Sequence, residues 1–379
     1  MRKILFIIPE YSHGGTNKSL ENLLSLIDKT KYDISIYCLY EDGGDYYKRL
    51  FAPFILQKSR LYYWLHDNVL TRKVMGLVNK LSKKDNFGFL YKREALWLQK
   101  KWQPDVVVGF QEGTSTLFAS FFPKTVNRIA WYHCPYIPSP AKADSFVKLY
   151  REFDSIVCVS NTFLYDMRKY FPQLESKFIT IYNLLDTSKV IDMSKEEICK
   201  MCSNKSGFKI LSVGRFAPKS QFHLIPRIVH DVLQSCHKNF KWYIIASGDE
   251  CEQLTREEIE KYQVRDNVIL LGAKDNPYPY IKAADLVACT SNSESFSYVI
   301  AEAKVLHTPV LSNDFPVAIE VVDESCGWIA NVKDMPSVLS RIIDNVDGEY
   351  DRKKEAAMQF EYSNTEILKK IDELLQIKV

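Results

Sequence analysis

The chain has 379 residues, of which 46% are hydrophobic and 26% charged, with a formal net charge of +3. This length and composition predict two folded domains and exclude a disordered or low-complexity chain. The net charge is too small to indicate a nucleic-acid partner, and no segment approaches the roughly 18 to 20 apolar residues of a transmembrane helix.

Nine Cys residues are scattered through the chain, an odd number that predicts reduced thiols in the cytoplasm rather than a disulfide framework. Cys199 and Cys202 form one C-x-x-C pair. Since no second pair accompanies it, we interpret the pair as incidental and predict no metal site there.

The first half of the chain contains short apolar runs separated by segments of helical length. These runs are residues 3–9, 33–40, 105–110, 128–133, 155–160 and 178–183. Their near-continuous apolarity indicates strands buried on both faces, as in a parallel sheet covered by helices. The first run is too short for the core of a signal peptide and fits a buried first strand.

Polar and charged residues dominate 186–207, which we predict to be a linker. The alternation then restarts, with runs at 208–215, 240–247, 267–272, 286–291 and 309–313. We therefore predict an α/β chain with two Rossmann-like domains facing a central cleft, 1–185 and 208–354. The tail at 355–379 has helical spacing and is expected to cross back to the first domain.

Ligands of such sheets bind at the carboxyl ends of the strands. Gly14 and Gly15 follow the first strand, where a glycine pair would allow a sharp turn and a close approach to a ligand. Arg215 and Lys219 follow the first strand of the second half, where they could clamp a diphosphate. Each motif by itself is equally compatible with an ordinary surface turn.

The third motif is the segment Ser291–Ala303, a polar loop that leads into a helix near Ser297. Glu294 in the loop and Glu302 in the second helical turn are acceptors suited to sugar hydroxyls. The backbone N–H groups of Ser297, Tyr298 and Val299 suit a phosphate. The alternative interpretation makes Glu302 a surface residue and Ser293 or Ser295 a helix cap.

These motifs occur in order at equivalent places of two similar halves, and the sequence resembles the family 4 glycosyltransferases, retaining enzymes of GT-B fold. The resemblance is strongest at 154–330 and at the Gly14-Gly15 loop. It implies that Glu302 binds the donor ribose and that Glu294 contacts the transferred sugar. It further implies that Arg215 binds the donor phosphates and that His133 orients the donor sugar.

The sequence departs from the family pattern at two places. Ser220 stands where the family carries its phosphate-binding lysine, so Lys219 would have to reach the phosphate from one residue earlier. The family's Glu-Gly-Phe is Glu294-Ser295-Phe296 here, which is tolerable unless the φ angle of Ser295 is positive.

Leaving diphosphates are often neutralised by a divalent cation bound to a D-x-D motif, which this sequence lacks. We therefore predict a hexosyltransferase without metal or cofactor, in which Arg215, Lys219 and the helix N-terminus stabilise the leaving group. The donor would be a UDP- or GDP-sugar. Alternatives from other classes are a nucleotide-sugar epimerase or phosphorylase of the same fold, and a non-catalytic nucleotide-sugar-binding protein.

Residues 58–101 contain eleven Lys and Arg against three acids and are interleaved with Tyr, Trp and Phe. This composition suits contact with an anionic membrane surface, although a solvated outer face of the domain would look the same. The first interpretation predicts a peripheral protein on the inner face of the cell membrane. The acceptor would then be a glycan or a lipid-linked sugar of cell-surface polysaccharide synthesis.

Overall fold

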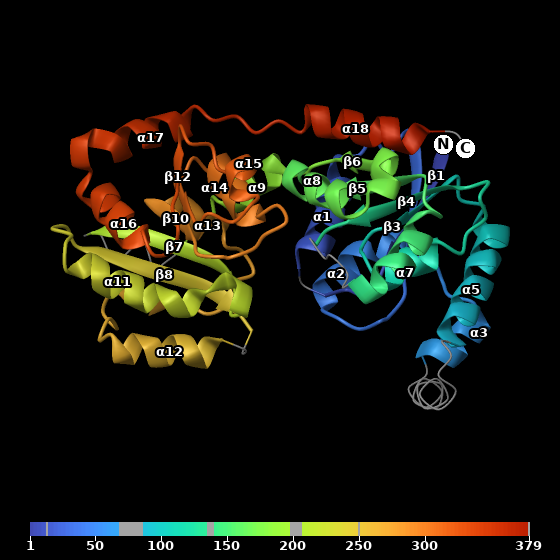
Figure 1. The fold of residues 1–379 in the computed structure, drawn as a ribbon, viewed down its shortest axis with the longest axis horizontal. Coiled ribbons are helices and arrows are strands. Elements are labelled where there is room, and N and C mark those ends of the chain that lie inside the picture. Colours follow the sequence, from blue (N-terminus) through green and yellow to red (C-terminus); the bar gives the residue numbers. More distant parts are fainter. Residues whose placement is uncertain (13, 68–85, 135–139, 198–206, 249–250, 378–379) are drawn as a thin grey trace. The chain divides into compact units, whose positions relative to one another are not determined.

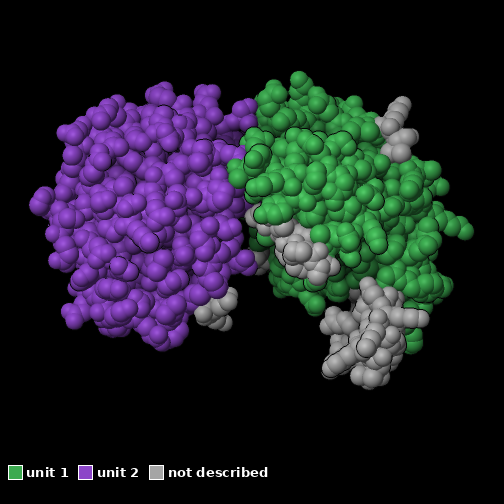
Figure 2. All heavy atoms as spheres, in the orientation of Figure 1, with its two compact units in different colours: residues 1–184, 364–379 green, residues 185–363 purple. Residues whose placement is uncertain are grey.

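A computed structural model describes residues 1–12, 14–67, 86–134, 140–197, 207–248 and 251–377. The chain divides into two compact units, which Figure 2 shows in two colours. Residues 1–184 and 364–379 form the N-terminal unit, and residues 185–363 form the C-terminal unit. The Cys199 and Cys202 pair lies outside the described residues.

The N-terminal unit contains a parallel six-stranded sheet in the order β2-β1-β3-β4-β5-β6 (Figure 1). Its strands are β1 (Arg2–Ile8), β2 (Tyr32–Cys38), β3 (Val106–Gly109), β4 (Asn127–Tyr132), β5 (Ser155–Cys158) and β6 (Phe178–Thr180). Most strand residues are buried on both faces, which explains why the runs are apolar without alternation.

Helices lie on both faces of this sheet. They are α1 (Gly15–Leu26), α2 (Asp45–Phe51), α3 (Arg60–Tyr62), the π-helix Tyr63–Asp67, α5 (Asn86–Trp102), α6 (Thr114–Ala119), α7 (Pro140–Tyr150), α8 (Asn161–Tyr170) and α18 (Thr365–Gln376). Helix α1 contributes Leu20 to one buried cluster and α5 contributes Leu98 to the other. Within the described ranges, no helix combines the length and apolarity needed to cross a membrane.

The C-terminal unit repeats the plan with a parallel sheet in the order β12-β11-β10-β7-β8-β9. Its strands are β7 (Phe208–Arg215), β8 (Phe240–Ser247), β9 (Val268–Leu270), β10 (Leu286–Cys289), β11 (Val310–Ser312) and β12 (Gly327–Ile329). Its helices are α9 (Thr187–Met193), α11 (Ile225–Leu233), α12 (Glu252–Lys261), α13 (Tyr278–Ala283), α14 (Tyr298–Val305), α15 (Ala318–Val321), α16 (Met335–Asp344) and α17 (Glu349–Met358). The fold class predicted from the sequence is therefore confirmed for each unit.

Two boundaries differ from those predicted, and one strand was missed. The expected linker 186–207 begins with helix α9, whose Val190 is buried and which belongs to the C-terminal unit. That unit also extends to Ser363 instead of ending at 354, so the first residues of the predicted returning tail belong to α17. Strand β12 was missed because its sequence, GWI, begins with glycine and contains one β-branched residue, which is a weak strand signal.

Helix α18 belongs to the N-terminal unit. It buries Ile371, Leu374 and Leu375 in the same cluster as β1 and α1. The Arg2 side chain caps the last turn of this helix: its Nη1 donates a hydrogen bond to the carbonyl oxygen of Gln376 at 2.6 Å. Apolar burial and capping of the final carbonyls together explain why the C-terminus closes on the first strand.

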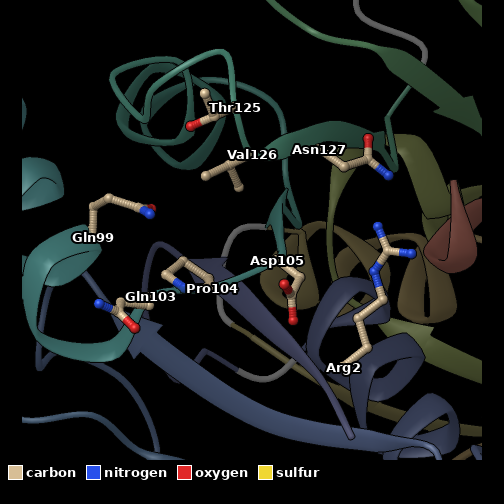
Figure 3. Close-up of a pocket in the computed structure, with 8 residues that line it drawn as sticks. All are labelled: Arg2, Gln99, Gln103, Pro104, Asp105, Thr125, Val126 and Asn127. Atoms are coloured by element: carbon tan, nitrogen blue, oxygen red, sulfur yellow. The ribbon is translucent and has the colours of Figure 1, made fainter. Parts of the chain in front are cut away.

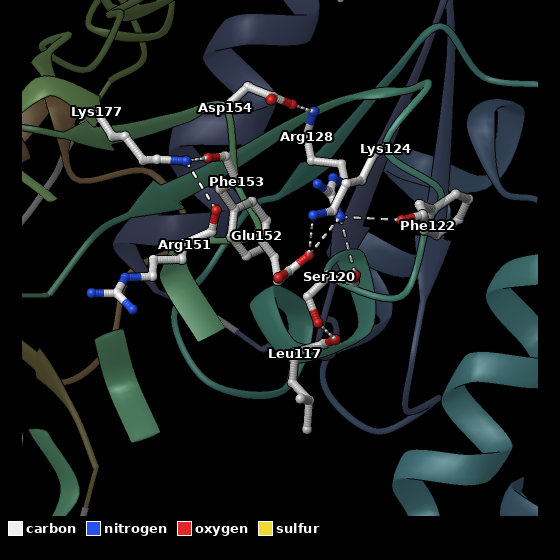
Figure 4. A network of polar contacts seen from close by, with 10 residues as sticks. All are labelled: Leu117, Ser120, Phe122, Lys124, Arg128, Arg151, Glu152, Phe153, Asp154 and Lys177. Carbon is white, nitrogen blue, oxygen red and sulfur yellow. Dashed lines mark hydrogen bonds and ion pairs between the residues drawn. The ribbon is translucent and has the colours of Figure 1, made fainter. Parts of the chain in front are cut away.

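A polar network at the amino ends of β4 and β5 holds the N-terminal unit together (Figure 4). The Arg128 side chain is buried, with 4% of the residue exposed. Its Nη1 donates to the carbonyl oxygens of Ser120 and Phe122 at 3.4 and 3.3 Å and pairs with Glu152 at 3.5 Å. Its backbone N–H donates to Asp154 at 2.8 Å. One guanidinium thus satisfies carbonyls that burial would otherwise leave without donors.

Replacing Arg128 with leucine should lower the free energy of unfolding by about 2 kcal/mol, because two buried carbonyls lose their donor. Urea denaturation would measure this, with Arg151→Leu as the control at an exposed arginine of the same region. Equal denaturation midpoints for the Arg128→Leu variant and the original protein would contradict the prediction.

Candidate active site

The turn after β7 and the loop after β10 are joined at the carboxyl edge of the C-terminal sheet. The backbone N–H of Asn292 donates to the carbonyl oxygen of Lys219 at 2.9 Å. The buried hydroxyl of Thr290 donates to the carbonyl oxygen of Ser220 at 2.6 Å. Two motifs that are about 70 residues apart in the sequence therefore form one surface.

The cationic and acidic side chains of these motifs meet on that surface. Lys219 Nζ lies 3.1 Å from Glu294 Oε2, and the hydroxyl of Ser291 donates to Glu294 Oε1 at 3.0 Å. Arg215 is the last residue of β7 and is exposed at the same edge. Ser220 is buried and uncharged, so Lys219 supplies the cation of this turn.

Glu302 lies in α14 and is 1% exposed, so its alternative interpretation as a surface residue is wrong. The hydroxyl of Tyr278, at the start of α13, donates to Glu302 Oε1 at 3.3 Å. A carboxylate this deeply buried is costly unless polar partners satisfy it, which is a reason to look for a functional role.

Ser295 replaces the family's glycine, so a positive φ angle at that position would be unfavourable. The positive φ occurs instead at Ser297, with φ 63° and ψ 81°. Ser297 also takes the N-terminal capping position of α14, so neither Ser293 nor Ser295 is the cap. Phe296, which lies between Ser295 and Ser297, is buried, and its ring centroid is 5.2 Å from that of Tyr298. A left-handed serine is strained, and such strain often accompanies ligand sites.

In the N-terminal unit, the loop before α1 is fixed by the buried amide of Asn17. Its Nδ2 donates to the carbonyl oxygens of Glu10 and Ser12 at 3.0 and 2.7 Å. Gly14 is extended, with φ 178°, and Gly15 has no positive φ, so the φ angle requires glycine at neither position. An added Cβ at Gly14 or Gly15 would meet open space, which leaves the backbone accessible to a ligand.

His133 directly follows β4 and is 8% exposed. Its ring centroid lies 4.7 Å from that of Phe110 and stacks on Trp131 at 6.4 Å. Burial lowers the pKa of His133 to about 3, so the imidazole is neutral near pH 7. Its buried Nε2 has no hydrogen-bond partner among the described residues.

Glu112 is a neighbour of His133 that the sequence analysis missed. Its Oε2 accepts the backbone N–H of His133 at 3.0 Å, and burial raises the pKa of the Glu112 carboxyl. The available signal was a carboxylate three residues after a buried strand, at the edge where ligands bind.

A pocket of about 330 Å³ opens at the carboxyl ends of β1 and β2. Tyr11 and Cys38 line it from the strand ends, and Lys58, Arg60 and Tyr63 line it from the basic stretch. Figure 3 shows a larger pocket of about 680 Å³, with Arg2, Asp105 and Asn127 among its lining residues. These three lie at the amino ends of β1, β3 and β4, the edge opposite to the one where such sheets bind ligands.

Two family profiles match the chain, one in each half. The family described as Glycosyltransferase Family 4 matches residues 13–189, and the family described as Glycosyl transferases group 1 matches residues 194–363. An uncharacterized glycosyltransferase of Methanocaldococcus jannaschii is 29% identical over 151 residues, 39% of this chain and 36% of that protein. The O-antigen biosynthesis glycosyltransferase WclY of Escherichia coli is 25% identical over 147 residues, 38% of this chain and 40% of that protein.

The matched segment spans well under half the length of either relative. Among solved structures, Anabaena HepE in complex with UDP-glucose superposes with a TM-score of 0.71 at 18% identity, covering 99% of both chains. By its fold and its two family profiles, the chain is a glycosyltransferase of the GT-B class.

Proposed function

We propose that the protein transfers a hexosyl group from a UDP- or GDP-sugar to a glycan or lipid-linked acceptor, with retention of configuration and without a metal ion. The observation that carries this proposal is the ion pair of Lys219, in the turn after Arg215, with Glu294, in the loop that leads into the helix of Glu302. HepE was solved with UDP-glucose and WclY is named for O-antigen synthesis, which supports a nucleotide-sugar donor and a polysaccharide product.

In this proposal Glu302 accepts hydrogen bonds from the donor ribose, and Glu294 accepts them from hydroxyls of the transferred hexose. Ionised carboxylates are acceptors for several hydroxyl groups at once, so each suits a polyol. Ser295 and Phe296 follow Glu294 in the same loop, and the ring of Phe296 is buried against that of Tyr298. Gly14 and Gly15 offer open backbone from the N-terminal unit to the donor or the acceptor.

The leaving nucleoside diphosphate gains negative charge as the glycosidic bond breaks. Arg215 and Lys219 would neutralise it, together with the backbone N–H groups at Ser297, Tyr298 and Val299. Each preorganised donor of this kind is worth about 3 to 4 kcal/mol in the transition state. The leaving phosphate then takes the proton of the attacking hydroxyl on the same face of the sugar, which accounts for retention.

His133 would orient the transferred sugar rather than accept a proton. A neutral imidazole with a buried Nε2 that lacks a protein partner suits a hydrogen bond to a sugar hydroxyl. Because the pKa of His133 is so low, the imidazole itself is not expected to titrate above about pH 5.

The experiment that tests the proposal is a thermal-shift panel with UDP-, GDP- and ADP-sugars, each run with and without EDTA. A ligand at about 100 times its dissociation constant should stabilise the protein by about 2.7 kcal/mol. We expect a shift with one nucleotide series that persists in EDTA. A shift that EDTA abolishes would overturn metal independence, and no shift with any of the sugars would overturn the assigned donor class.

We also propose that the described parts of the stretch 58–101 contact an anionic membrane surface, next to the pocket lined by Lys58 and Arg60. Phe89 is 72% and Trp64 57% exposed. On α5, Phe89, Leu96 and the exposed Lys92, Arg93 and Lys100 share one face. Glu94, the acid of that helix, is buried and accepts hydrogen bonds from Tyr37 and Ser59. Its charge therefore does not lie on the exposed face, which remains basic. Exposed aromatics with cations suit the headgroup region.

Flotation with vesicles containing anionic phospholipid should recover the protein in the lipid fraction, and neutral vesicles should not. The double variant Phe89→Ser with Trp64→Ser should lose flotation, whereas Tyr165→Ser, an exposed aromatic on α8, should retain it. Equal flotation of the double variant and the original protein would exclude this surface, and absence of flotation with anionic vesicles would exclude membrane contact.

A further inference from the structure

The carboxyl ends of β3 and β4 are joined by the side chain of Glu112. Its Oε2 accepts the backbone N–H of His133 at 3.0 Å, and the backbone N–H of Cys134 also donates to this carboxylate. Both donors belong to the segment that presents the buried imidazole of His133. The position of that imidazole therefore depends on an acceptor in the loop that follows the neighbouring strand β3.

The loop that carries Glu112 is itself held firmly. The buried hydroxyl of Thr116 donates to the carbonyl oxygen of Gln111 at 2.7 Å. Gly113 adopts φ 87°, a backbone conformation that favours glycine and turns the chain directly after Glu112. A Cβ at Gly109 would lie 2.9 Å from the Cα of Thr116, so the strand end and α6 are in close contact. The carboxylate thus acts from a rigid base.

We propose that Glu112 is the positioning residue for His133, and that its ionised carboxylate holds the end of β4 in the geometry required for glycosyl transfer. The inference rests on the proposed function and adds to it a residue and a dependence on pH. A neutral amide cannot replace the carboxylate fully, because one of its two terminal atoms is itself a donor and would oppose an N–H group.

The titratable groups that face Glu112 do not themselves change charge near neutral pH. Tyr132 at the end of β4 and Tyr150 on α7 face it, and burial raises the pKa of both phenols far above neutrality. Cys134 faces it through its backbone. Burial lowers the pKa of His133 to about 3 and raises that of Glu112. Among these groups, Glu112 is therefore the one expected to take up a proton first as the pH falls below neutrality.

The direction of the stability effect separates positioning from a structural role. A carboxyl whose pKa is raised by folding stabilises the fold at pH below its unfolded value, and this contribution disappears as the pH rises through the folded value. At pH 7.5 the ionised, half-buried Glu112 is thus not a source of stability. Replacement by glutamine should leave the melting temperature unchanged or higher.

The test compares the original protein with Glu112→Gln, Glu112→Asp and the exposed control Glu175→Gln. The probes are the donor selected by the thermal-shift panel and a prenyl-diphosphate-linked disaccharide, with release of nucleoside diphosphate followed from pH 4.5 to 8. We expect Glu112→Gln to lower kcat about 10- to 100-fold, as misplacement near a reacting centre does. It should shift the acid limb of the pH profile to lower pH and leave the donor dissociation constant within twofold.

Glu112→Asp should keep the acid limb at an intermediate rate, and it provides the same test if Glu112→Gln does not fold. A Glu112→Gln variant with unchanged rate and pH profile would overturn the inference and leave the proposed function standing. Rate losses in both variants that merely follow a lowered melting temperature would overturn it as well. If the original protein binds no sugar nucleotide, the proposed function itself fails.

Discussion

Glu302→Gln should weaken binding of the nucleotide sugar about 100-fold while the protein remains folded. If Glu302 accepts two hydrogen bonds from the ribose, the amide loses the charge and turns one acceptor into a donor. Hydrogen bonds to charged groups contribute about 1.5 to 3 kcal/mol each, and about 2.8 kcal/mol corresponds to 100-fold in the dissociation constant. Isothermal titration calorimetry with the donor selected by the panel would measure the change.

Two further variants show whether the effect belongs to the carboxylate. Tyr278→Phe removes the 3.3 Å hydrogen bond to Glu302 and should weaken donor binding much less, because the carboxylate remains. Glu324→Gln changes an exposed carboxylate of the same unit and should leave the dissociation constant unaltered. A Glu302→Gln variant with the affinity of the original protein would remove Glu302 from the donor site.

The parts of the fold that the sequence predicted are those in which local pattern and burial agree. Strands such as β1 and β7 were recognised because their central residues, 4–8 and 210–212, are buried on both faces and mostly apolar. Helix α9 was missed because its sequence, TSKVIDM, contains few apolar residues, and its stability comes from Val190 and from the cap at Asp186. Short elements depend on tertiary contacts that a pattern does not contain.

The candidate site also has a part that could be predicted from the sequence and a part that could not. Glu294, Glu302 and Arg215 were selected because the motifs after two predicted strands resemble those of a known family, and position alone left other interpretations open. Contacts between distant segments could not be predicted from the sequence. The hydrogen bond from Asn292 to the carbonyl oxygen of Lys219 and the pairing of Glu112 with the His133 backbone depend on loop conformations. Loop geometry is set by such side-chain to backbone bonds, which have no periodic signal.

Arg215→Ala and Lys219→Ala should each lower kcat about 100- to 1,000-fold, because each removes a preorganised donor to the leaving diphosphate. The dissociation constant of the donor should change less than kcat, since the charge that these side chains meet develops as the bond breaks. Single-turnover release of nucleoside diphosphate would measure both variants. Arg227→Ala, which removes an exposed arginine paired only loosely with Asp231 at 3.9 Å, is the matched control.

The double variant Lys219→Ser with Ser220→Lys moves the cation to the position where the family carries its lysine. We expect it to be as slow as Lys219→Ala, because Ser220 is buried and its carbonyl is held by Thr290 at 2.6 Å. Lys219, in contrast, is half exposed and already lies 3.1 Å from Glu294. Recovery of the rate in the double variant would mean that the turn rearranges when the donor binds. Continued loss would mean that this protein has moved its phosphate lysine by one residue, and that the hydrogen bonds from Asn292 and Thr290 fix the turn in which that position works.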